Sequence, residues 1–131
     1  MENNTIEKEK SYTLRPLVAS DMGAICKIIT AIGIRQFKEC FKVEDLKKDE
    51  NGKINTEALG FSIMFDIAGI IIANIPKAEK EIQDFLGSLT GLKKNEVATM
   101  PFADYGELIM EVVMKDDFRD FFKRVMKLFN L

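Results

Sequence analysis

The chain contains no histidine and no tryptophan among its 131 residues. Histidine is the most common general acid-base residue and the most common metal ligand, so its absence excludes Ser-His-Asp and Cys-His catalytic arrangements. The sequence also has no glycine-rich phosphate-binding loop, no Cys-x-x-Cys pair and no nucleophile elbow. We therefore predict a protein that is not an enzyme, with no catalytic residue, no metal site and no cofactor.

An excess of positive charge is also missing, because 19 basic residues face 21 acidic ones and the net charge is -2. Proteins that bind nucleic acid carry a basic surface, so this balance argues against a nucleic-acid partner. The two cysteines, Cys26 and Cys40, stand among apolar positions with helical spacing. We expect both to be buried apolar residues in a reducing compartment.

Strands with alternating polarity are lacking, and helical periodicity runs through most of the chain. Residues 1–11 are polar and predicted to be a flexible tail without the apolar stretch of a signal peptide. Residues 12–131 are predicted to form one all-α domain of about six helices with short connections. The expected helices are 22–32, 34–41, 56–75, 77–89, 101–113 and 116–131, with a short helical turn at 94–100.

The segment 42–55 is charged and contains Asn51-Gly52, which is a strong turn signal. It faintly resembles a calcium loop, but Lys47 and Ala58 stand where that loop needs acidic ligands, so a solvated linker is the better interpretation. The acidic residues Asp116, Asp117 and Asp120 could in principle hold a cation. A first helical turn that complements the helix dipole explains them better.

The longest apolar stretch, 58–75, has one charged residue, Asp66, and just reaches the length of a membrane span. A carboxylate in the middle of a span costs about 2.5–3.5 kcal/mol, and neither a basic flank nor aromatic belts accompany it. We therefore predict a central helix that is buried on most sides and no membrane partner. Asp66 would lie on a wet stripe or pair with a lysine or arginine. Phe65 is expected in the core, where its replacement by alanine would cost ~3–5 kcal/mol.

Phenylalanine is concentrated at the carboxyl end, where four of the ten phenylalanines lie between Phe118 and Phe129. Apolar residues cover a wide arc of the predicted helix 116–131, which either packs wholly in the protein's own core or leaves part of its surface for a partner helix. Helix-in-groove recognition uses the same spacing, so core packing and partner binding stay as two equal interpretations. The candidate partner-binding residues are Phe118, Phe121, Phe122, Val125, Met126 and Phe129.

Three short motifs, in order, resemble one protein family. The first runs from Tyr12 through Leu14-Arg15-Pro16-Leu17 to Asp21, and the helix after it ends in a segment IGIRQF at 32–37. The second is LTGLKKNEV at 89–97, and the third runs from ELI at 107–109 to KDDFRDFF at 115–122. Together they resemble the tail assembly chaperones of tailed phages and prophages of Firmicute-type bacteria, over about residues 12–129 except the charged segment 42–55.

This resemblance implies a mostly helical, non-enzymatic protein of virus morphogenesis. Such a chaperone binds the tape measure protein and keeps it soluble, and it helps to recruit tail tube protein through a form extended by ribosomal frameshifting. It acts in the host cytoplasm, it is absent from the mature virion, and it can form homo-oligomers. The alternative is a small all-α regulatory or scaffold protein-interaction domain of bacterial origin that acts as a dimer.

Overall fold

The computed structural model describes residues 12–41 and 56–128, and the side chains of 41, 56–59, 123 and 125–128 lie outside the description. Within these ranges the chain is all-α and contains no strand, as predicted. The α-helices are α1 (Met22–Ile32), α2 (Ile34–Lys38), α3 (Thr56–Ala73), α4 (Ile75–Thr90), α5 (Lys94–Ala98), α6 (Phe102–Val113) and α7 (Asp116–Leu128). Single turns of 3-10 helix, η1 (Ala19–Asp21) and η2 (Glu39–Phe41), precede α1 and follow α2.

Two glycines end helices where the sequence predicts that they do. Gly33 has a φ of 112° and donates its backbone N–H to the Ile29 carbonyl. Gly91 has a φ of 78° and donates its backbone N–H to the Gly87 carbonyl. Positive φ angles are strained for residues with a Cβ, so glycine is the residue that allows the chain to leave the helix here. The turn at Gly33 separates α1 from α2, and the turn at Gly91 separates α4 from α5.

The break after the long central helix falls slightly earlier than predicted. Helix α3 ends at Ala73, and α4 begins at Ile75 and turns away by 109°. Pro76 therefore lies in the first turn of α4, where its missing N–H costs no helical hydrogen bond. Asn74 forms the corner, and its side-chain amide donates to the Ile70 carbonyl at 2.7 Å.

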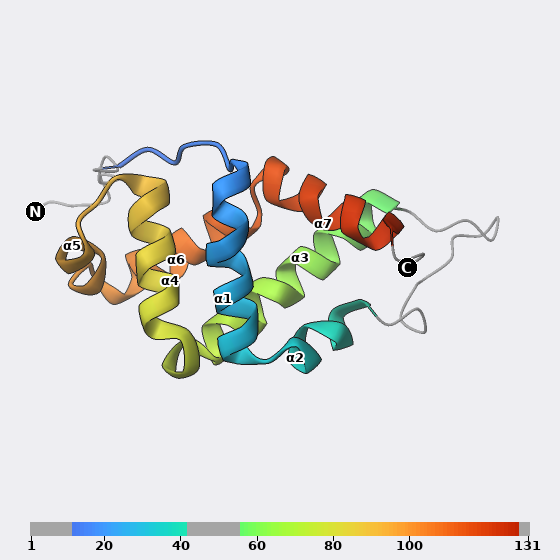
Figure 1. Ribbon diagram of the computed structural model, residues 1–131, viewed down its shortest axis with the longest axis horizontal. Helices are drawn as coiled ribbons and strands as arrows, with labels where there is room; N and C mark the ends of the chain where they lie inside the picture. The colour runs from blue at the N-terminus through green and yellow to red at the C-terminus, as the bar shows by residue number, and fades with distance from the viewer. Residues whose placement is uncertain (1–11, 42–55, 129–131) are drawn as a thin grey trace, which may run out of the picture.

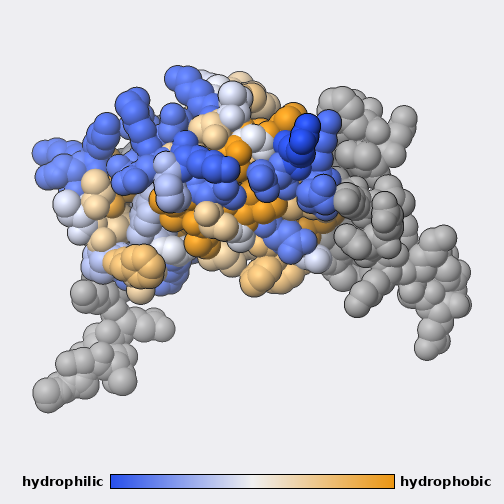
Figure 2. All heavy atoms as spheres, turned by 90° about the horizontal axis from the view of Figure 1, so that it is seen from below, coloured by the Kyte–Doolittle hydropathy of each residue, from blue (hydrophilic) through white to orange (hydrophobic). Residues whose placement is uncertain are grey.

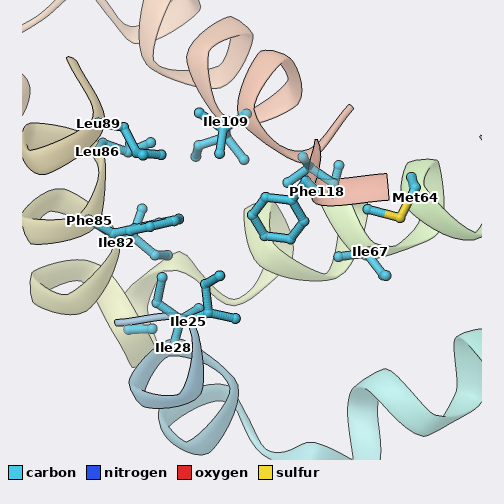
Figure 3. Close-up of a cluster of buried hydrophobic side chains, with 14 of the residues drawn as sticks. Ile25, Ile28, Met64, Ile67, Ile82, Phe85, Leu86, Leu89, Ile109 and Phe118 are labelled. Carbon is cyan, nitrogen blue, oxygen red and sulfur yellow. The ribbon is translucent and has the colours of Figure 1, made fainter. Parts of the chain in front are cut away.

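Five helices surround a single apolar core. Helices α1 and α4 lie side by side and run in opposite directions, with α6 behind them, while α3 crosses the molecule diagonally (Figure 1). Helix α7 packs against both α3 and α6, and the short α5 adjoins α4. Side chains from all five long helices converge on a common centre, as Figure 3 shows. Its labelled members are Ile25, Ile28, Met64, Ile67, Ile82, Phe85, Leu86, Leu89, Ile109 and Phe118.

A half-buried ion pair fastens the segment before α1 to the helical core. The Arg15 guanidinium donates to both carboxylate oxygens of Asp21 at 2.8 Å, and its Nη2 also reaches the Ser88 hydroxyl at 2.7 Å. The backbone N–H of Arg15 donates to the Leu89 carbonyl near the end of α4. Arg15 thus joins the start of the domain to a helix more than seventy residues further along the chain.

The Asp21 side chain holds the turn that leads into α1. It is 5% exposed, and its Oδ2 accepts the backbone N–H of Val18 at 2.8 Å, which closes the turn before α1. The hydrogen bonds from Arg15 lower the pKa of the Asp21 carboxyl, because they stabilise its charged form. Arg15 and Asp21 of the first motif therefore both have a structural role.

Two side chains expected inside the protein, Cys26 and Phe65, are at its surface, while Asp66 lies on the wet stripe that was one of its two predicted positions. Cys26 is exposed on α1, because it stands one helical step away from the buried Ile25. Phe65 is 55% exposed, and Asp66 is also exposed, which places it on the water-facing side of α3. The prediction of a central helix buried on most sides is therefore wrong for one face of α3.

Candidate partner-binding surfaces

The carboxyl-terminal helix α7 places its phenylalanines mostly inward. Phe118 and Phe122 are buried and stacked, with ring centroids 5.4 Å apart and an interplanar angle of 15°. Both belong to the core of this fold and present no exposed surface to a partner. Phe121 is half-buried and meets the edge of Phe122 at 5.1 Å, so part of its ring is accessible.

The remaining α7 candidates lie outside what the structure describes. Val125 and Met126 are within the helix, but their side chains are not described, and Phe129 follows the last described residue. Their proposed contact with a partner stays a prediction. Of the six candidates, Phe121 is the one whose side chain is both described and partly accessible.

A different surface carries the exposed apolar residues on a long helix. Phe61, Phe65 and Ile72 of α3 are 53%, 55% and 39% exposed. Their spacing of four and seven residues places them on one side of the helix. The opposite side is buried in the core through Ile63, Met64, Ile67 and Ala68. We call the exposed side of α3, residues 61, 62, 65, 69, 72 and 73, the α3 face.

The α3 face combines its three large residues with three small ones. Ser62, Gly69 and Ala73 are exposed beside the phenylalanines and the isoleucine. At Gly69 a Cβ would meet no atom within 4 Å, so the backbone is open to an approaching chain. Such an alternation of bulky and small residues is suited to receiving another helix closely.

Apolar surface is also visible in the space-filling view from the side of the α3–α4 turn. Apolar side chains reach the surface over the middle of the molecule, and hydrophilic side chains gather along one edge (Figure 2). Other exposed large apolar residues are scattered over several elements, and the most exposed is Phe102 at 95%. Single exposed residues of this kind are ordinary, whereas three aligned on one side of a helix form a larger apolar surface.

Sequence reasoning missed the α3 face because α3 is apolar on every side. A helix without a polar stripe is normally interpreted as buried all round, which led to the expectation for Phe65. One signal was present: Asp66, the single charged residue within 60–73, marks the side that faces water.

The half-buried Cys40 lies close enough to Asp66 of α3 for the charge of that carboxylate to act on its thiol. Burial of the thiol is the main cause that raises the pKa of Cys40 to about 11, and the negative charge of Asp66 adds to it. A thiol with such a pKa is almost entirely protonated near neutral pH and is a weak nucleophile. Cys40 is therefore a packing residue rather than a reactive one.

The centre of the core contains a small apolar cavity of about 40 Å³. Its walls come from α1, α2, α3, α4, α6 and α7, and every lining side chain is apolar, including Ile28, Ile67, Phe85 and Val112. An apolar cavity of this size offers no hydrogen-bond partner to water and no room for a metabolite-sized ligand. It is a gap in the packing of the core.

The acidic residues near α7 are engaged in local contacts. Asp116 pairs with Arg119 at 2.6 Å, and Asp120 pairs with Arg124 at 3.1 Å. Asp117 accepts the backbone N–H of Leu17 at 2.9 Å and so ties α7 to the segment before α1. Within 12–41 and 56–128 no three His, Cys, Asp or Glu side chains are grouped as metal ligands would be.

The described part of the chain has no single helix long and apolar enough to cross a membrane. Residues 60–73 and α4 reach the required length and apolarity only when the two helices are taken together, and the chain bends by 109° between them.

Comparisons with models of protein families, with curated proteins and with solved structures find no match for this chain. The case for a function therefore depends on the motifs of the sequence and on the surfaces described above.

Proposed function

We propose that this protein is a phage tail assembly chaperone, which binds the tape measure protein and keeps it soluble while the tail is assembled. The observation that carries the proposal is the α3 face, an exposed apolar ridge on a small all-α domain. A chaperone for a long apolar helical protein needs such a surface, because it must cover apolar residues that would otherwise aggregate.

The ridge has the geometry for holding one helix of the partner. Phe61, Phe65 and Ile72 span eleven residues, which is about 16 Å along a helix axis. An amphipathic partner helix would lie along this ridge, with its apolar residues between the phenylalanine rings. The partly exposed Phe121 of α7 could extend the same contact, because α7 packs beside α3.

The three sequence motifs that resemble the tail assembly chaperones are a second argument for the proposal. The motif from Leu14 to Asp21 has a clear structural purpose, because Arg15 and Asp21 lock the start of the domain to α4. Recruitment of tail tube protein by a frameshift-extended form and action in the host cytoplasm belong to the same proposal.

Co-expression tests the proposed function. The gene for a very long tape measure protein is expected downstream of the gene for this chain, with a tube protein gene upstream. That tape measure protein is expressed alone and together with this chain, and its soluble fraction and co-elution are measured. We expect it to be insoluble alone and to elute with this chain when both are made. The proposal fails if no such gene is present, or if the tape measure protein is soluble alone and never elutes with this chain.

A further inference from the structure

Asp66 is an exposed carboxylate at the border of the α3 face. It is the one charged residue within 60–73, and it stands about 100° round the helix axis from Phe65. Within 12–41 and 56–128 no lysine or arginine forms an ion pair with it. The described part of the fold therefore leaves this charge to water or to a partner.

The α3 face changes in character round the helix axis. At 100° per residue, its three large residues lie within about 40° of one another. Its three small residues follow at about 40–80° from Phe65, and Asp66 comes next at about 100°. Across its width, the face therefore passes from large apolar side chains over small ones to a carboxylate.

The Asp66 border is the one nearer to η2. Helix α2 and the turn η2 that follows it lie beside α3 (Figure 1). Burial and the charge of Asp66 both raise the pKa of Cys40 in η2, which places that thiol near the carboxylate. The open part of the face is thus the strip between Asp66 and the large residues, and a helix docked there has one edge beside the carboxylate.

We propose that Asp66 selects which helix the α3 face holds, by pairing with a lysine or arginine at the edge of that helix's apolar stripe. This inference rests on the proposed function, because it describes the segment of the tape measure protein that binds. A partner with an acidic edge would bring two negative charges together where apolar surface is being covered. A lysine or arginine suits the site, because its apolar stem packs on small residues while its charged end reaches the carboxylate.

The position of Asp66 along α3 specifies the pattern of the partner segment. It lies five residues after Phe61 and six before Ile72, close to the middle of the face. The basic residue should therefore lie near the middle of the partner's apolar stripe, with apolar residues three or four positions away on either side. The expected partner is an amphipathic helix of this pattern.

A single charge has a marked effect here because the apolar contact is small. Three half-exposed side chains offer much less than the about 800 Å² that each partner buries in a standard interface. Such a contact binds weakly and accepts many apolar helices, whereas a charge at its rim decides which helix is favoured. We therefore expect weak binding that depends on salt.

Two synthetic peptides that differ only at one edge test the selection. Both form the same amphipathic helix with leucines along one side, and the residues at the edge of the leucines are lysine in one peptide and glutamate in the other. Fluorescence anisotropy measures the binding of each labelled peptide to the full chain at low and at high salt. We expect the lysine peptide to bind about five- to tenfold more tightly at low salt, with a smaller difference at high salt.

Variants of the chain assign this preference to one residue. Asp66→Lys should reverse it, and Asp66→Asn, which removes the charge and keeps the shape, should bind both peptides about equally. Glu107→Lys is the matched control, because it makes the same change of charge at an exposed position of α6 and should keep the wild-type preference. Phe65→Asp should abolish the binding of both peptides, which locates them on the α3 face.

The outcomes separate this inference from the proposed function. A wild-type chain that binds both peptides equally or binds neither overturns the inference, and so does a lysine preference that survives Asp66→Lys. With the tape measure protein itself, Asp66→Lys should lower co-elution and Glu107→Lys should not. If co-elution is the same with Asp66→Lys and the wild type, the selection fails and the proposed function stands. If the wild type prefers the lysine peptide through Asp66 but never binds the tape measure protein, the proposed function fails and the charge preference of the α3 face stands.

Discussion

Replacing Asp21 by alanine tests how the segment before α1 is held to the domain. The Asp21 carboxylate is 6% exposed in its side chain and accepts three hydrogen bonds, two from Arg15 and one from the Val18 N–H. Loss of a charged hydrogen bond in such a site costs about 1.5–3 kcal/mol. Arg15 is 36% exposed and keeps its bonds to Ser88, so water recovers part of the loss.

These effects together predict that Asp21→Ala lowers the free energy of unfolding by about 2 kcal/mol. For a chain of this length, the change corresponds to a drop of roughly 7 °C in the melting temperature. Urea unfolding at pH 7, followed by circular dichroism at 222 nm, measures it. Arg15→Met and the double variant complete a thermodynamic cycle, in which we expect a coupling of about 1–2 kcal/mol between the two side chains.

The pH dependence provides an independent check on the same pair. Because the pKa of Asp21 is lowered in the folded state, its contribution to stability is present above the unfolded-state value near 4. It is lost as the pH falls through the folded-state pKa. The difference in stability between the wild type and Asp21→Asn should therefore be full at pH 6–7 and shrink below about pH 4. A coupling near zero, or a difference that does not change with pH, would refute the reasoning.

Three further predictions follow from single residues. Phe65→Ala should lower the free energy of unfolding in urea by less than about 1.5 kcal/mol, because half of the ring is in water. Leu108→Ala, at a fully buried position, should lower it by about 2–5 kcal/mol. Equal losses would contradict the placement of α3. Gly91→Ala should lower the melting temperature by several degrees, since alanine is strained at a φ of 78°, and an unchanged melt would show that the turn adapts. A thiol reagent at pH 8 should label the exposed Cys26 quickly and Cys40 far more slowly, because burial raises the pKa of Cys40 to about 11. Equal labelling rates of the two cysteines in the native protein would contradict this prediction.

Local signals in the sequence predict most of the fold. Glycines at 33 and 91 mark the helix ends because they adopt positive φ angles, and helical periodicity defines the long helices. The corner at Asn74 comes before Pro76 because a proline is most easily placed within the first turn of the following helix. The all-α class was predictable from helical periodicity, whereas the sequence alone left the corner one or two residues too late.

The candidate surface could not be predicted in the same way. Periodicity shows which side of a helix is apolar, but it does not show how much of that side the rest of the chain covers. On α7 the apolar arc is turned inward at Phe118 and Phe122. On α3, where no polar stripe separates two sides, the arrangement of α6, α7 and η2 around the helix leaves Phe61 and Phe65 exposed. The link from Arg15 to Ser88 is equally invisible to local patterns, because it joins residues 73 positions apart.

The central claim is that the α3 face holds the tape measure protein, and co-purification with two variants tests it most directly. The tape measure protein is co-expressed with the wild type, with Phe65→Asp and with Phe102→Asp, and the amount recovered with each chaperone is measured. A charge at the centre of an apolar contact typically costs more than 2 kcal/mol, so we expect Phe65→Asp to lower recovery at least tenfold. Phe102→Asp should recover as much as the wild type. Equal recovery with Phe65→Asp and the wild type would contradict the account.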